Sequence, residues 1–180
     1  MVEDREKVSI GARYCNTLRD IPRPRMFLSK RYAQASVAFL RAGWTREMAI
    51  CDAYLLREKA WLISTTTSTV RIRAFIKAAN AFIACAKDTL PEPSNERLAY
   101  YGTAGECYSE ARDLKNAGDN YRKGKQYSAA GYAYKDGEYF DEVAKIIIQH
   151  SSALDHATLE DFTTATAEYY FKVGHSRLSF

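Results

Sequence analysis

The side chains of this 180-residue sequence that could do chemistry are few, and the richest stretch of them is basic. Residues 19–31, RDIPRPRMFLSKR, hold five cations against one acid, Asp20. The two prolines favour an extended backbone that presents these cations to phosphates or to an acidic peptide, with Met26 and Phe27 as anchors. The alternative is a basic linker whose apolar side chains tuck into the first helical hairpin. The candidate contacts are Arg19, Arg23, Arg25, Lys30 and Arg31.

Pairs of carboxylates are the next candidates, because general acid–base catalysis uses two acids held close together. Glu106 with Glu110 and Asp141 with Glu142 could be called such pairs. Carboxylates on helices in water are usually solvated charges. We therefore interpret both pairs as surface charges.

The other motifs in the sequence do not define a catalytic, metal or phosphate-binding site. Residues 122–127, RKGKQY, lack the second glycine and the hydroxyl residue of a phosphate-binding loop, so Gly124 is interpreted as a helix-ending glycine. His150 and His156 are too few for a metal site, which needs three or four converging ligands. The sequence contains no Gly-x-Ser-x-Gly nucleophile motif. It therefore predicts no catalytic residue, no metal and no cofactor.

The composition is typical of one globular domain, with 47% hydrophobic and 27% charged residues. The net charge of +4 is uneven, since residues 1–90 carry +8 and residues 91–180 carry −4. The basic half could attract an acidic partner, or the charges could simply lie on solvated helix faces. No apolar run follows the N-terminus and no 18-residue apolar stretch occurs, so we expect an intracellular protein without membrane contact. The scattered cysteines are expected as buried free thiols: Cys15, Cys51, Cys85 and Cys107.

Helical periodicity dominates the chain and is strongest in residues 68–88, STVRIRAFIKAANAFIACAKD. Apolar residues recur there at steps of three and four and define one helix face, with Arg71 beside or opposite it. A hydroxyl run precedes the segment and Ser94 or Asn95 follows it, and these side chains can cap helices. No segment alternates like a β-strand. Helices are expected at about 3–18, 29–42, 45–60, 69–87, 95–111, 113–123, 126–136, 139–149 and 156–173.

One stretch near the C-terminus repeats another near the N-terminus. Residues 127–144, YSAAGYAYKDGEYFDEVA, align without a gap on residues 32–49, YAQASVAFLRAGWTREMA, and residues 107–127 are a looser third copy. A small residue lets two helices approach, aromatic residues fill the space beside it, and a glycine in a left-handed conformation ends the helix. Ala49 and Ala144 then begin the inner face of the next helix. Stacked helical hairpins have this pattern. The structural repeat positions are Tyr32, Ala35, Phe39, Gly43, Ala49, Tyr127, Ala130, Tyr134, Gly137 and Ala144, and left-handed glycines are expected at Gly43, Gly118, Gly124 and Gly137.

Two pieces of the chain resemble tetratricopeptide-like helical repeats: KRYAQASVAFLRAGWTREMAICDAYLLREKA and YYGTAGECYSEARDLKNAGDNYRKGKQYSAAGYAYKDGEYFDEVAKII. More narrowly, they resemble the repeat region that follows the motor in large eukaryotic UvrD-like (superfamily 1) helicases, over about residues 28–150. The sequence differs from a whole helicase because it has no G-x-x-x-x-G-K-[ST] loop. It also differs from ideal repeats, since Tyr121 and Tyr134 are only 13 residues apart, less than half of a roughly 34-residue unit. The resemblance implies a short, irregular solenoid without a motor.

We therefore predict an all-α domain of eight or nine helices, stacked as antiparallel hairpins in a short right-handed α-solenoid. Residues 1–27 are assigned to an N-terminal helix and basic linker and residues 28–180 to the repeat domain, which the 88–95 loop could divide. The expected function is a non-catalytic protein–protein interaction scaffold, a fragment or relative of the helicase repeat region, with a protein or peptide partner. Two alternatives remain open. One is a nucleic-acid-binding accessory module, with nucleic acid as the less favoured partner, and the other is an enzyme whose site the sequence does not reveal.

Overall fold

The computed structural model describes residues 25–64, 68–89 and 94–177, and all the regular structure in these ranges is helical. The all-α class is therefore confirmed, and each described α-helix begins and ends within four residues of its predicted bounds. The predicted helix at 3–18 lies outside the described residues. The elements are α2 (Arg25–Arg41), α3 (Thr45–Trp61), α4 (Thr69–Lys87), α5 (Asn95–Glu110), α6 (Leu114–Lys123), α7 (Tyr127–Asp136), α8 (Phe140–His150), the short 3-10 helix η1 (Ser151–Ala153) and α9 (His156–Arg177).

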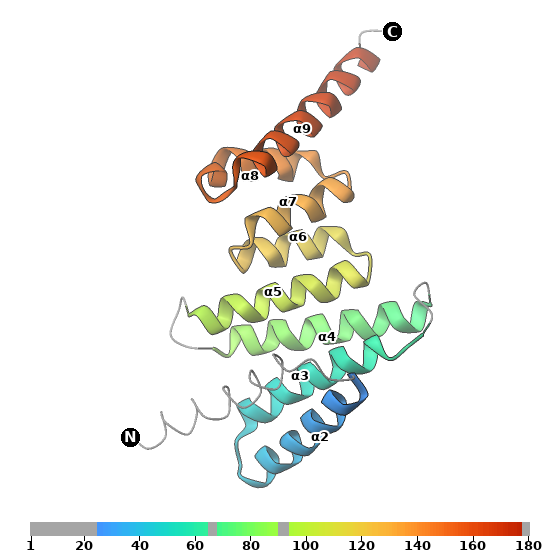
Figure 1. The fold of residues 1–180 in the computed structure, drawn as a ribbon, viewed down its shortest axis with the longest axis vertical. Coiled ribbons are helices and arrows are strands. Elements are labelled where there is room, and N and C mark those ends of the chain that lie inside the picture. Colours follow the sequence, from blue (N-terminus) through green and yellow to red (C-terminus); the bar gives the residue numbers. More distant parts are fainter. Residues whose placement is uncertain (1–24, 65–67, 90–93, 178–180) are drawn as a thin grey trace.

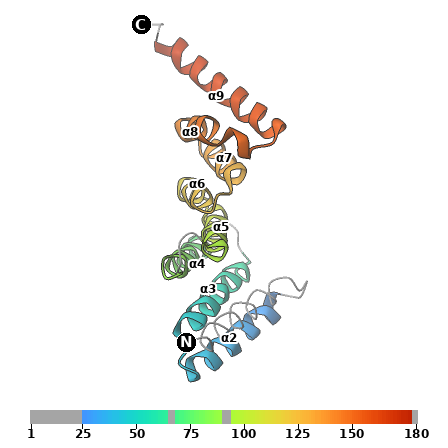
Figure 2. The same ribbon diagram turned by 90° about the vertical axis from the view of Figure 1, so that its left-hand side faces the viewer.

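The helices form an open row in which each one packs mainly on the helix before it and the helix after it. Figure 1 shows them crossing the long axis one above another, from α2 at one end to α9 at the other. Helix α9 also contacts α7, and Figure 2 shows its second half projecting beyond α8. In such a quasi-one-dimensional arrangement the stability of each helix depends chiefly on its neighbours.

A row of aromatic rings forms the core of helices α2 to α5. The rings of Tyr32 on α2 and Tyr54 on α3 are stacked with centroids 5.1 Å apart. Tyr54 in turn meets the ring of Phe82 on α4 edge to face at 5.0 Å, and Phe82 lies 6.4 Å from Tyr100 on α5. All four side chains are buried. Offset and edge-to-face pairs of this kind are favourable beyond the apolar area that they bury, so the row ties α2 to α5.

From α5 onward the helices are joined by contacts between glycines and aromatic rings. The motif Ala-Gly-x-x-Tyr begins at residues 104, 117 and 130, so it repeats every 13 residues. A β-carbon at Gly105 would stand 2.7 Å from the ring of Tyr121, which is the tyrosine of the next motif. Gly118 meets the ring of Tyr134 in the same way. The absent side chain lets each ring lie directly on the preceding helix, which explains the short repeat.

The helix-ending turns share one geometry. After α2, α5, α6 and α7 a backbone N–H bonds to the carbonyl five residues earlier at 2.8–3.0 Å, and the residue before that donor has a positive φ. This is the Schellman arrangement. The carbonyl that accepts the bond belongs to an aromatic residue each time: Phe39, Tyr108, Tyr121 and Tyr134.

The predicted left-handed glycines are only partly correct. Gly43 has φ 74° as predicted. Gly124 and Gly137 do end α6 and α7, but their φ values are −76° and −91°. The left-handed residue is the next one in each case, Lys125 or Glu138. The prediction for Gly118 is wrong because this glycine lies inside α6, under the ring of Tyr134.

Two further side chains differ from their predicted placement. Arg71 is buried on the packed face of α4, with Phe75 and Phe82. Ala49 is exposed, because the packed face of α3 is centred on Ile50 and its neighbours, about 100° further around the helix. The predicted burial of Ala35 and Ala130 is confirmed.

Candidate functional site

The structure describes only part of the predicted basic strip. Arg19 and Arg23 lie outside the described residues, and Arg25 is the first residue of α2. Lys30 is exposed on α2, and Arg31 is half-buried and makes a contact there. The described residues therefore bring two of these five side chains, Lys30 and Arg31, onto one helix.

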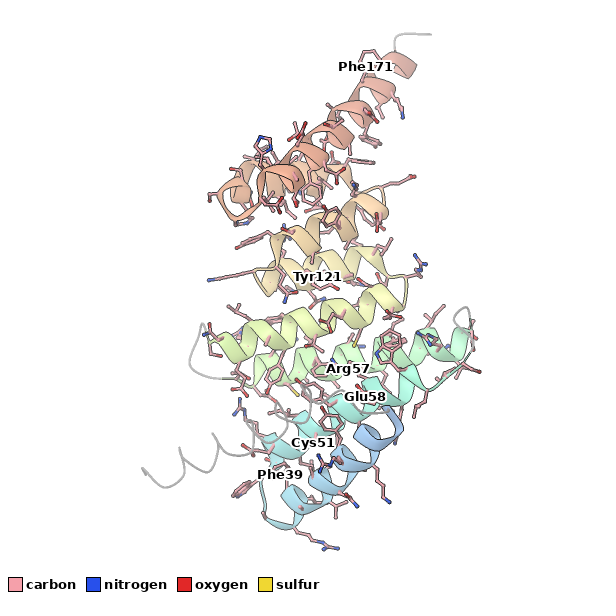
Figure 3. All side chains as sticks on the ribbon, viewed as in Figure 1. Phe39, Cys51, Arg57, Glu58, Tyr121 and Phe171 are labelled. Carbon is pink, nitrogen blue, oxygen red and sulfur yellow. The ribbon has the colours of Figure 1, made fainter. Side chains whose placement is uncertain are left out.

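A cavity of about 220 Å³ lies across the middle of the row and is lined by side chains from α3, α4, α5 and α6. Figure 3 labels Arg57 on α3 and Tyr121 on α6, on either side of the α4–α5 pair that the cavity crosses. This volume is below the roughly 300–1,000 Å³ of typical small-molecule sites, so the cavity suits a single side chain. Its lining residues are Arg57, Trp61, Phe75, Glu106, Cys107, Ser109, Glu110 and Tyr121.

Arg57 forms one wall of this cavity and has a largely buried side chain, 13% exposed. Its guanidinium lies over the ring of Tyr54 at 5.1 Å and donates to Glu58 at 3.2 Å. Its ion pair with Glu106 is longer, 3.7 Å, which exceeds hydrogen-bond distance. The nearly buried Glu58 therefore takes the direct hydrogen bond and leaves Glu106 only partly neutralised.

Arg71 contacts three of the lining residues, Trp61, Phe75 and Glu110, and is buried between the two rings. Its guanidinium lies 5.0 Å from the centroids of both Trp61 and Phe75. It donates to the carbonyl of Ile63 at 3.0 Å and to Glu110 at 3.2 Å. A planar guanidinium suits this position because it stacks on aromatic faces while donating from its edge. Arg71 therefore fixes the start of α4 against the end of α3.

The two glutamates at the mouth of the cavity keep much of their access to water, with Glu106 48% and Glu110 35% exposed. They lie one turn apart near the C-terminus of α5, and its last turn contains no basic residue. Carbonyl dipoles make a helix C-terminus favourable for cations and unfavourable for acids. The interpretation of these two residues as plain surface charges therefore missed that α5 places them at the edge of a cavity.

Cys107 and Tyr121 form the floor of the cavity, which is less polar than its mouth. Burial raises the pKa of the Cys107 thiol to about 12, so the sulfur stays protonated at neutral pH. Burial also raises the pKa of the Tyr121 hydroxyl, and the charges of Glu106 and Glu110 raise it further. Ser109 lies 3.5 Å from this hydroxyl. The cavity thus combines an aromatic floor with a negative rim.

A second polar cluster ties α3 to the start of α5. Arg46 donates to Glu96 at 2.9 Å and to Thr89 at 3.3 Å, while Tyr100 donates to Glu96 at 2.7 Å. Burial is the main cause of the raised pKa of the Tyr100 hydroxyl, and its bond to Glu96 adds to it. Each group in this cluster has a partner inside the fold, so we assign it a structural role.

The remaining candidate residues from the sequence contact other residues of the fold. His150 stacks on Tyr127 with ring centroids 3.8 Å apart, and the exposed His156 lies 3.8 Å from Glu160. Asp141 accepts from Tyr170.

Within 25–64, 68–89 and 94–177, no three His, Cys, Asp or Glu side chains are grouped to hold a metal ion. None of the helices in these ranges is long and apolar enough to cross a membrane.

The three described cysteines are buried and none of them is in a disulfide, as predicted. They are Cys51, Cys85 and Cys107, while Cys15 lies outside the described residues. Burial raises the pKa of Cys85 to about 11. A protonated thiol is a poor nucleophile, so Cys85 and Cys107 act as small apolar residues in the packing.

Comparison of the chain with protein-family models, curated proteins and solved structures gave no match. The cavity is therefore interpreted from its own residues.

Proposed function

We propose that the chain is a non-catalytic scaffold for protein–protein interaction, and that it receives a segment of its partner at the cavity between α3 and α6. We further propose that the row of helices is a right-handed, tetratricopeptide-like solenoid related to the repeat region of UvrD-like helicases. The resemblance of residues 28–150 supports the relationship. Stacked helical repeats commonly use their long open surfaces to bind other proteins.

The observation that carries this proposal is the composition of the cavity. Four successive helices contribute to its wall, so a ligand there touches side chains far apart in the sequence. The lining contains aromatic, charged and hydroxyl groups, which is the mixture found where an interface anchors a partner side chain. The two arginines are held by rings and carboxylates, so the shape of the cavity exists before a partner arrives.

The test is selection of ligands from a displayed library of protein-derived peptides, using the full chain as bait. A matched pair of variants locates the binding surface: Ser109→Trp fills the cavity mouth, and Gln149→Trp adds the same ring to the exposed face of α8. We expect selected peptides to bind the native chain and Gln149→Trp but not Ser109→Trp. Circular dichroism checks that both variants fold. Selection of no peptide above background, or of peptides that bind Ser109→Trp equally well, contradicts the proposal.

Nucleic acid is the other partner class to exclude by experiment. Phosphates would meet Glu106 and Glu110 at the cavity mouth, so we expect no oligonucleotide to bind there. Fluorescence anisotropy with a labelled single strand measures this directly. Tight binding that weakens steeply with added salt would favour a nucleic-acid-binding module over a protein scaffold.

A further inference from the structure

The cavity between α3 and α6 has a chemistry that selects among partner side chains, and this inference rests on the proposed scaffold function. The charged residues of its lining are Arg57, Glu106 and Glu110. Glu58 is paired with Arg57 and Arg71 with Glu110, so the cavity and these partners together carry a net charge of −1. The positive charges lie against rings with little exposure, whereas Glu106 and Glu110 face water. An entering group therefore meets carboxylates first.

We propose that the cavity binds a basic side chain, an arginine or a lysine, of an extended segment of the partner protein. The cation lies between the carboxylates of Glu106 and Glu110, and its aliphatic stem packs toward Tyr121. A guanidinium makes the better ligand because it can donate to two carboxylates at once from its planar edge.

Three features of the structure favour a cation. Among the described residues, Glu106 is held only by a 3.7 Å ion pair with an arginine that already donates to Glu58, so its oxygens retain hydrogen-bonding capacity. Both acids sit near the C-terminus of α5, where the helix dipole adds negative potential and no basic residue of the last turn offsets it. The pKa of Tyr121 is raised by burial and further by these same acids, so the negative potential reaches the cavity floor.

The contrary possibility is an acidic ligand on Arg57, since the buried Nε of Arg57 has no hydrogen-bond acceptor among the described residues. That atom is enclosed, however, and an incoming carboxylate would pass Glu106 and Glu110 to approach the guanidinium. Like charges at this range repel, so the anion is disfavoured. The experiment includes an acidic probe to decide between the two.

The test uses the full chain and four capped pentapeptides, Gly-Gly-X-Gly-Gly, in which X is arginine, lysine, citrulline or glutamate. Binding is followed by amide shifts in ¹H–¹⁵N NMR spectra. We expect the arginine peptide to shift amides near residues 106–110 and 121, with a dissociation constant on the order of 1 mM for a single side chain. Citrulline has the same shape without the charge, and we expect it to bind about tenfold more weakly, as one lost ion pair of moderate strength predicts.

The matched variants are Glu106→Gln and, as a control with the same change at an exposed site on α9, Glu168→Gln. Glu106 is half-exposed and its removal leaves Arg57 paired with Glu58, so the variant keeps its fold, which its thermal midpoint verifies. We expect Glu106→Gln to weaken the arginine peptide about fivefold to tenfold and Glu168→Gln to leave it unchanged.

Several results overturn the inference: equal binding of citrulline and arginine peptides, preference for glutamate, unchanged affinity in Glu106→Gln, or no shift with any peptide. These outcomes differ from failure of the scaffold proposal. Displayed peptides that bind at the cavity without a basic residue would contradict only the cation site, whereas failure to select any peptide there would contradict the scaffold itself.

Discussion

The ring of Tyr134 on α7 lies against Gly118 on α6, and its hydroxyl donates to Asp119 at 2.6 Å. The same tyrosine provides the carbonyl that closes the turn after α7. One residue therefore packs on the helix before it, anchors itself there by a hydrogen bond, and sets the direction of the helix after it. The contact between a glycine and a ring recurs 13 residues earlier between Gly105 and Tyr121, and the Tyr121 carbonyl likewise closes the turn after α6.

The first prediction concerns the contact between Gly118 and Tyr134. Replacing Gly118 by Ala should destabilise the protein by about 1–3 kcal/mol, because the added methyl group has no space beneath the ring of Tyr134. In a Tyr134→Ala background the same change should be neutral or stabilising by up to about 1 kcal/mol, since alanine has the higher helix propensity. Urea unfolding of the four proteins in this double-mutant cycle measures the difference. Equal effects in both backgrounds would refute the contact.

The sequence predicted the helices well and the contacts between them less well. Helix periodicity and capping residues are local, so α4 and α5 appear where predicted, with Ser68 and Ser94 as their N-caps. The Ala-Gly-x-x-Tyr repeat was available in the sequence and would have identified Gly118 as a packing residue. The cavity was not foreseeable, because its wall joins Arg57 to Tyr121 through four helices, and no local pattern records that approach.

The second prediction concerns the left-handed residue Glu138, which has φ 61°. A residue with a β-carbon is strained in this region, and glycine is not. We expect Glu138→Gly to stabilise the protein by about 0.5–1 kcal/mol. This is a net value, because the entropy that glycine adds to the unfolded chain offsets part of the relieved strain. The contrasting change Glu168→Gly, inside α9, should destabilise by about 1 kcal/mol. Denaturation midpoints of the two variants should therefore move in opposite directions, and a shift of both to lower urea would contradict the turn geometry.

The third prediction distinguishes the stacking of the Arg71 guanidinium on two rings from its ion pair with Glu110. Arg71→Ala should cost about 2 kcal/mol, because it removes stacking on two rings and leaves the Ile63 carbonyl without its donor. Glu110→Gln should cost less than about 1 kcal/mol, because its carboxylate is partly solvated. Arg71→Lys should be intermediate, since an ammonium cannot stack in the same way. If Glu110→Gln proved as costly as Arg71→Ala, the ion pair rather than the stacking would hold α4.

The fourth prediction concerns alkaline pH. Burial raises the pKa of the Cys107 thiol from 9.0 to about 12, and burial also raises that of the Tyr134 hydroxyl. Between pH 9 and 12 the unfolded chain therefore releases protons that the folded chain retains, so stability is complete below about pH 9 and falls as the pH rises. Each such group contributes a slope of up to about 1.4 kcal/mol per pH unit. Urea unfolding at several pH values measures the slope, which Cys107→Ala should reduce, and stability that stays constant above pH 9 would contradict these shifts.

The fifth prediction concerns the C-terminal end of the row. Phe162 of α9 is buried with Ala130, Tyr134, Val143 and Ile146, in a cluster separate from the core that runs from α2 to α7. Phe162→Ala should cost about 3–5 kcal/mol and should release α8 and α9 before the rest. Hydrogen exchange should quicken in residues 140–166 and change little in α3 and α4. Uniform acceleration along the chain would show a single cooperative unit instead.

The most direct test of the scaffold account is hydrogen exchange of the full chain with and without a peptide selected by display. The account predicts protection of the end of α3, the second half of α5 and the segment around Tyr121, because these surround the cavity. It predicts little change on the projecting half of α9. Protection confined to α9, or no protection anywhere despite saturation with the peptide, would contradict the central claim that this cavity is where the protein meets its partner.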